Sequence, residues 1–174
     1  ITPAAKRSKS GNRTTANRWQ RILGGLGHCI RVVESYDGVP ADMMVALHAW
    51  RSANSIVQFR RKYPNRPIIV ALTGTDIYRF QESHPEVTRS SMEMADWLIC
   101  LHDRVVYDIP AVLGAKLTVA PQSAKPLTKS RRPEQRHYDI CVIGHLREEK
   151  DSLRTAYAVR ELPSESQLRV IHLG

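Results

Sequence analysis

The sequence predicts an α/β domain built on a parallel sheet, followed by the start of a second domain of the same kind. Two observations lead to this fold class. Short runs of Val, Ile and Leu are apolar at nearly every position, which is typical of strands buried on both faces of a parallel sheet. Segments with the apolar spacing of helices lie between most of these runs, and such alternation gives right-handed βαβ units.

Seven apolar runs are predicted to be strands. They are spread along the whole chain, at 29–34, 43–48, 68–72, 97–101, 117–120, 139–143 and 168–173. The chain opens on Ile1 without a methionine and stops directly after the last run. We therefore expect a fragment, with a strand ahead of Thr2 and further chain after Gly174.

Four segments carry the apolar spacing of an amphipathic helix. Their apolar stripes cover 16–26, 56–63, 105–113 and 153–162. Gly27, Pro64 and Pro163 are expected to end the first, second and fourth of these helices, and Pro110 is expected to kink the third.

A polar stretch from Lys125 to Arg136 divides the chain. It has two prolines, five basic residues and no apolar periodicity, which are features of a linker. The predicted organisation is therefore an α/β domain at 1–124, a linker at 125–137, and the start of a second α/β domain at 138–174.

The composition narrows the class of protein. The chain has 174 residues and a formal net charge of +9, so it attracts phosphate groups whatever its role. Binding to nucleic acid is one alternative that follows, although aromatic residues make up only 6% and no known binding module is visible. No apolar run is long enough to cross a bilayer, and the N-terminus has no secretory signal.

The cysteines and the missing motifs bear on cofactors and location. Cys29, Cys100 and Cys141 each lie inside an apolar run, so we expect buried thiols in a reducing cytoplasm. The sequence has no metal-ligand spacing, no nucleophile elbow and no Walker phosphate loop. We therefore predict a cytoplasmic protein without a membrane span, a metal or a cofactor.

Ligands of open parallel sheets bind beyond the carboxyl ends of the strands, so the residues that follow each run are the candidates. The first loop carries Lys6 and Arg7, and then Ser10, Gly11 and Asn12 ahead of a helix. A helix N-terminus beside basic residues stabilises an anion. The alternative is a solvated basic loop.

The next two strand ends are also polar. His48, Arg51 and Ser52 follow the second run, where His48 is either a structural histidine or a ligand-binding one. Thr73, Gly74, Thr75 and Asp76 follow the third run. Asp76 is the candidate catalytic residue: it either caps the next helix, orients a side chain, or acts as a general base.

Two more strand ends complete the candidate set. Gln122 and Ser123 either bind a ligand or form a turn. The first strand of the second domain is followed by Gly144, His145, Arg147 and Lys150, either a clamp for a nucleotide diphosphate or a charged surface loop.

Taken in order, these segments resemble a known family. SGNR at 10–13, ALHAWRSA at 46–53, LTGTDIY at 72–78, APQSA at 120–124 and VIGHLREEKD at 142–151 stand in the order of the landmarks of GT-B glycosyltransferases of the GT4 type. The closer resemblance is to the selenosugar synthases of selenoneine biosynthesis. It extends over essentially the whole chain.

The resemblance implies a two-domain transferase that transfers a sugar from a UDP-sugar to selenophosphate. UDP-GlcNAc is the expected donor. The resemblance also implies that the N-terminal domain binds the acceptor and the C-terminal domain binds the nucleotide, without a metal ion. Lys150 matches the lysine that contacts the diphosphate. His145 stands at the usual arginine position and Arg147 follows two residues later, so either is a candidate for the same contact.

One position departs from the pattern of related enzymes. Thr73 stands where many of them have a histidine that contacts the donor sugar. Selenophosphate arrives as an anion with a strongly nucleophilic selenium, so positioning and leaving-group stabilisation matter more than deprotonation. The alternatives are an ordinary GT4 transferase with a hydroxyl or thiol acceptor and, from another class, a basic nucleic-acid-binding module.

Overall fold

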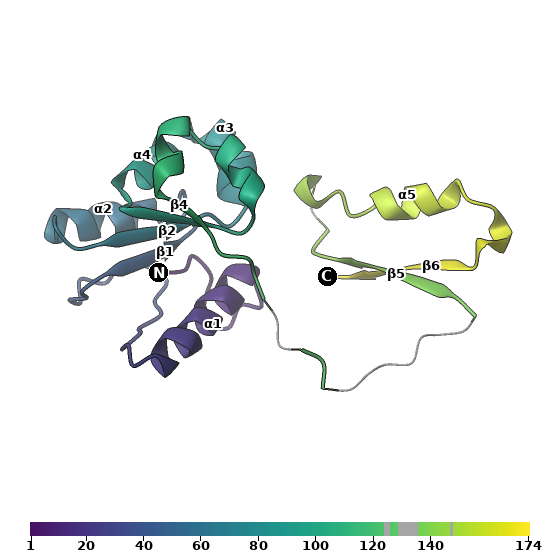
Figure 1. The fold of residues 1–174 in the computed structure, drawn as a ribbon, viewed down its shortest axis with the longest axis horizontal. Coiled ribbons are helices and arrows are strands. Elements are labelled where there is room, and N and C mark those ends of the chain that lie inside the picture. Colours follow the sequence, from purple (N-terminus) through teal and green to yellow (C-terminus); the bar gives the residue numbers. More distant parts are fainter. Residues whose placement is uncertain (124–125, 129–135, 147) are drawn as a thin grey trace. The chain divides into compact units, whose positions relative to one another are not determined.

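The computed structural model describes residues 1–123, 126–128, 136–146 and 148–174 (Figure 1). The chain divides into two compact units, Ile1–Ser123 and Ala124–Gly174. Part of the predicted linker, residues 124–125 and 129–135, lies outside the described residues.

The first unit is built on a four-stranded parallel sheet in the order β1-β2-β3-β4. Its strands are β1 (Met44–Leu47), β2 (Ile68–Ala71), β3 (Trp97–Cys100) and β4 (Leu117–Val119). All four fall within predicted runs. The register pairs Ala46 with Val70 and Leu98 with Leu117. The unit is thus a mixed α/β domain with a parallel sheet, which is compatible with a Rossmann-like fold.

Helices lie on both faces of this sheet (Figure 1). Helix α1 (Gly11–Gly25) packs Ala16 and Trp19 against Leu47 and Ala71 on one face. The other face is covered by α2 (Ala53–Lys62) and α4 (Pro85–Met94), with the short α3 (Gln81–Ser83) between β2 and α4. Pro64 and the left-handed Gly27 follow α2 and α1 closely, as the sequence predicts.

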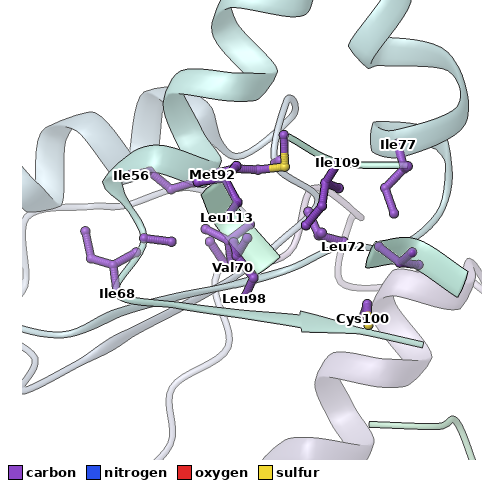
Figure 2. Close-up of a cluster of buried hydrophobic side chains, with 14 of the residues drawn as sticks. Ile56, Ile68, Val70, Leu72, Ile77, Met92, Leu98, Cys100, Ile109 and Leu113 are labelled. Carbon is purple, nitrogen blue, oxygen red and sulfur yellow. The ribbon is translucent and has the colours of Figure 1, made fainter. Parts of the chain in front are cut away.

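The main core lies between the sheet and this second helical layer. Figure 2 shows Ile56 and Met92 from the two helices above Ile68, Val70 and Leu98 of the sheet. These side chains are fully buried. Their burial, at roughly 1.5–3 kcal/mol for each large apolar side chain, holds the strand ends in fixed positions.

Three expectations are wrong. The run at 29–34 forms no strand: Thr2 donates a backbone hydrogen bond to Val33 (3.0 Å), but the segment has no strand assignment. The single kinked helix at 105–113 is instead two 3₁₀ helices, η2 (Asp103–Tyr107) and η3 (Ala111–Lys116). They meet at Pro110, which has no N–H to continue a helical ladder. Cys29 is exposed and not buried, as is Cys141 of the second unit.

The sequence patterns also miss one helical region. The chain after β2 forms a five-residue π-helix, η1 (Asp76–Phe80), which continues into α3 and then α4. The buried face of α4 presents Thr88 and Ser91 beside Met92. Small polar residues on a buried face give no apolar stripe, so periodicity could not reveal this helix.

The second unit contains a parallel pair of strands, β5 (Tyr138–Ile143) and β6 (Leu168–Leu173). They are joined through helix α5 (Arg154–Arg160), which falls within the predicted segment, and the short 3₁₀ turns η4 (Glu148–Lys150) and η5 (Ser164–Ser166). Within the described residues, no helix is long and apolar enough to cross a membrane.

Candidate functional site

The carboxyl end of β1 is shaped by His48. Its backbone is left-handed, with φ of 77°, which is uncommon for a residue other than glycine. The His48 N–H donates to the Ala71 carbonyl of β2 (2.8 Å). This hydrogen bond ties the residue that follows β1 to the last residue of β2.

The imidazole of His48 is a buried structural group. Its Nδ1 accepts the backbone N–H of Arg51 (3.2 Å), so the proton of the neutral ring lies on Nε2, which donates to Thr75 Oγ1 (3.0 Å). Burial lowers the pKa of His48 to about 4, and the positive charge of Arg51 acts in the same direction. His48 therefore stays neutral at pH 7 and joins the ends of β1 and β2.

Asp76 is the second link between these strand ends. Its carboxylate accepts backbone N–H groups from Ala49 (3.0 Å), Thr73 (2.9 Å) and Gly74 (2.8 Å). Burial raises the pKa of Asp76, while the three N–H donors oppose that shift. The side chain is fully buried and both oxygens are occupied. All three donors are backbone N–H groups of residues ahead of η1, and η1 has no side-chain cap, so Asp76 does not cap this helix and instead orients the backbone of the two strand ends.

The backbone at Gly74 makes this arrangement possible. Its φ of 111° lies in the region that side chains rarely adopt. The Gly74 carbonyl accepts the N–H groups of Ile77 and Tyr78, both at 2.9 Å. Thr73 and Thr75 on either side are partly exposed, whereas Asp76 is not. The two threonines are thus partly exposed at the sheet edge, while the buried Asp76 carboxylate holds the backbone of this segment through hydrogen bonds.

An aromatic cluster packs beside His48. Trp50 stacks on Phe80 with ring centres 4.0 Å apart and planes 8° apart, and His84 lies 4.6 Å from Trp50. The Arg51 guanidinium lies over Phe80 at 5.8 Å. The aromatic cluster therefore holds an exposed cation at the carboxyl end of β1, on the same edge as Thr73 and Thr75.

Ser52 is used inside the fold. Its hydroxyl donates to the Leu47 carbonyl (2.7 Å) and is buried, and it does not cap α2. Of the three residues predicted after β1, only Arg51 is exposed, because His48 and Ser52 are buried.

The basic loop ahead of α1 divides into a structural part and an exposed part. Ser10 is the N-cap of α1, and its hydroxyl accepts the Arg13 N–H (3.4 Å). The buried Arg13 guanidinium donates to the carbonyls of Ala4 and Ala5, and it lies 3.7 Å from Glu34. Arg13 thus shapes the loop and offers no charge to a ligand. Lys6 and Arg7 are exposed beside it, followed by Gly11 and Asn12 in the first turn of the helix.

The segment after β4 contacts α1. Gln122 Nε2 donates to Thr15 Oγ1 (3.1 Å), and Arg18 donates to Ser123 Oγ (2.7 Å). Two groups of predicted residues are therefore each brought together: one by His48 and Asp76 at the ends of β1 and β2, the other by α1 and the segment after β4.

In the second unit, the predicted donor residues follow β5. The Gly144 N–H donates to Leu173 at the end of β6 (2.8 Å), His145 is exposed, and Lys150 is exposed at the end of η4. Arg147 lies outside the described residues, so its predicted contact stays a prediction.

One group of polar side chains at the same edge of the first unit was not predicted from the sequence. Tyr78 Oη lies 3.1 Å from both His102 Nε2 and Asp108 Oδ2. Tyr78 belongs to the quoted LTGTDIY segment, but no pattern in the sequence predicts its contact with His102. The signal that could have singled out His102 is its position directly after the β3 run.

Two other features bear on where a ligand binds. A shallow groove of about 430 Å³ lies at the amino ends of the strands, lined by Met43, Asn65, Pro67, Ile69, Asp96 and Trp97. None of the candidate residues lines it. Across the described residues there is no group of three His, Cys, Asp or Glu side chains placed to hold a metal ion.

The chain was also compared with known proteins. No protein-family model matches it, and no curated protein matches its sequence. A functional assignment for this chain therefore depends on its fold and on the geometry of the carboxyl edge.

Proposed function

We propose that this chain is part of a cytoplasmic GT-B glycosyltransferase that transfers a sugar from a UDP-sugar to selenophosphate. The proposed donor is UDP-GlcNAc. The observation that carries the proposal is the braced carboxyl edge of the first unit. His48 and Asp76 lock the segments after β1 and β2 together, and Arg51 remains exposed on them. A rigid edge with exposed cations is suited to positioning an anionic acceptor.

The acceptor would be held by cationic side chains that form no ion pair among the described contacts. Arg51 is exposed at the end of β1, and Lys6 and Arg7 are exposed in the loop ahead of α1. Gly11 and Asn12 supply N–H groups in the first turn of a 15-residue helix that has no acidic residue there. These groups favour a small dianion over a neutral sugar.

The donor would be held by the segment after β5. Lys150 is exposed and has no acidic partner among the described contacts, so its charge is available to a diphosphate. As UDP leaves, negative charge grows on its β-phosphate, and a lysine placed there lowers the barrier. In this proposal the enzyme works by positioning and by stabilising the leaving group, with no metal step.

The test is to supply the complete protein with UDP-GlcNAc and selenophosphate and to search for a selenium-linked sugar by mass spectrometry. Parallel reactions contain glucose, malate or a simple thiol as the acceptor. A selenosugar formed faster than the other products supports the proposal. Product with a hydroxyl or thiol acceptor alone points to an ordinary GT4 transferase and overturns the choice of acceptor.

Absence of any sugar transfer overturns the proposal as a whole. The nucleic-acid alternative has its own measurement, the affinity for random duplex DNA over a range of salt concentrations. Binding that falls steeply with salt and shows no sequence preference reflects the +9 charge only.

A further inference from the structure

A second set of polar side chains lies at the carboxyl edge, where the segments after β2 and β3 meet. Tyr78 comes from η1, His102 follows β3, and Asp108 directly follows η2. The Tyr78 hydroxyl lies 3.1 Å from His102 Nε2 and 3.1 Å from Asp108 Oδ2. All three side chains are exposed, so a ligand at this edge can reach them.

Counting protons places one proton on His102 Nε2. A phenol has one proton, and an ionised carboxylate can only accept, so Tyr78 donates to Asp108. The Tyr78 oxygen is then the acceptor toward His102, which requires a proton on His102 Nε2. In a neutral imidazole with Nε2–H, the other nitrogen, Nδ1, has a lone pair and is basic.

Further contacts hold this set in place. Gln81 Nε2 donates to the Asp108 carbonyl (2.6 Å), and the buried Cys100 thiol donates to the His102 carbonyl (3.2 Å). The Tyr78 and His102 rings are parallel to within 1°. The ring of His102 is thus oriented by Tyr78, and its backbone is anchored to β3.

The other acid–base candidates at this edge are already occupied. Both nitrogens of His48 are hydrogen-bonded and buried, and both oxygens of Asp76 accept backbone N–H groups. His102 is exposed and oriented, and its Nδ1 has no hydrogen bond among the described contacts. The titratable groups next to it in the described chain are Tyr78, Asp108, its neighbour Asp103 and Cys100.

We infer that His102 takes the proton from the acceptor during sugar transfer and that Tyr78 is the residue that positions it. This inference rests on the proposed function. Selenophosphate bound as a dianion still carries one proton, and the lone pair of its selenium forms the bond to the anomeric carbon of the sugar. The bond from that carbon to the diphosphate oxygen breaks, and its electron pair leaves with UDP. The remaining proton of selenophosphate passes to His102 Nδ1.

The decisive measurement is the pH profile of kcat/KM for the complete protein and for His102→Gln, with His28→Gln as the matched control at an exposed histidine of the first unit. The wild type should lose activity on the acid side as the imidazole becomes protonated. His102→Gln should lower kcat/KM by about 100-fold and remove that acid limb. His28→Gln should keep both.

Tyr78→Phe tests the positioning role separately. In the wild type, ¹⁵N chemical shifts of the His102 ring should show the Nε2–H tautomer, and in Tyr78→Phe a mixture of tautomers, with kcat reduced more than KM is changed. An unchanged tautomer in Tyr78→Phe overturns the positioning role. Because both side chains are exposed, the urea midpoint should stay within the range of surface substitutions, which checks that the variants are folded.

The failures of the two proposals look different. If the wild-type protein transfers sugar and His102→Gln keeps the wild-type rate and pH profile, the acceptor reacts without giving a proton to His102, and only this inference is overturned. If the wild type transfers no sugar to any acceptor, the proposed function is overturned and the inference falls with it.

Discussion

Asp76 accepts the backbone N–H of Ala49 at 3.0 Å, and this contact joins the segment after β2 to the segment after β1. The same carboxylate also binds the N–H groups of Thr73 and Gly74. One buried side chain therefore determines the shape of the edge at which the proposed acceptor binds.

Replacing Asp76 with Asn should destabilise the first unit by about 3 kcal/mol, because an amide group cannot accept all three N–H donors and places its own NH₂ among them. Asp42→Asn is the matched control, since Asp42 is exposed and should change the free energy of unfolding by less than about 0.5 kcal/mol. Urea unfolding followed by tryptophan fluorescence is a suitable measurement, because Trp19, Trp50 and Trp97 all lie in this unit. Equal effects of the two substitutions would contradict the bracing role.

His48 should make the stability of the first unit depend on pH. The folded state keeps His48 neutral down to about pH 4, whereas the unfolded chain takes up the proton near pH 6.5. As the pH falls through this window, the unfolded state binds more protons, and the stability should drop by about 3 kcal/mol.

His48→Asn is the variant that isolates this effect, because Asn tolerates the left-handed backbone and does not titrate. The variant should be less stable than the wild type at pH 7, and the difference should shrink toward pH 4. A difference that stays constant across the urea unfolding series would argue against a buried neutral His48.

Gly74→Ala should destabilise the first unit by about 1–2 kcal/mol, because a side chain at φ of 111° is strained even though no atom lies within 4 Å of the added Cβ. Gly24→Ala, in the last turn of α1 with equally open space and no left-handed φ, should instead stabilise it by about 0.5–1 kcal/mol. Thermal unfolding of both variants checks the opposite signs. Two substitutions with the same sign would contradict the argument from backbone conformation.

Lys150→Ala should reduce turnover with UDP-GlcNAc by about 100-fold or more and leave the unfolding midpoint unchanged, because Lys150 is exposed and its proposed role is in the transition state. Lys62→Ala is the control: Lys62 is also exposed, and it donates to the Gly38 carbonyl (2.7 Å) at the far end of α2. Steady-state kinetics on the complete protein measures both. Full activity of Lys150→Ala would remove Lys150 from the donor site.

The sequence predicted the strands well and the helices less completely. Continuous Val and Ile runs such as 68–72 mark strands because both faces of a parallel strand are buried. The same rule failed at 29–34. Arg31 and Glu34 are exposed there, and the segment is not a strand of the described sheet. The segment 76–94 was missed because its helices bury Asp76, Thr88 and Ser91, which periodicity counts as polar.

The candidate residues were located by one rule, that ligands meet the carboxyl ends of parallel strands. That rule reached Arg51 and Asp76 correctly as residues of this edge, but it could not say which side chains the fold would use itself. Ser52 turned inward to Leu47, and Arg13 turned inward to Ala4 and Ala5. The partners of Tyr78 come from segments more than twenty residues away, which no local pattern contains.

Two features of this protein followed from the sequence alone. The parallel sheet is predictable because apolar runs and their spacing reflect local burial. The excess of cations is predictable because net charge is a sum over residues. Only the tertiary structure decided which polar side chains at the strand ends are buried within the fold and which are exposed. The difference arises because a hydrogen bond between His48 and Thr75, or between Asp76 and Ala49, forms only when two strand ends already lie side by side.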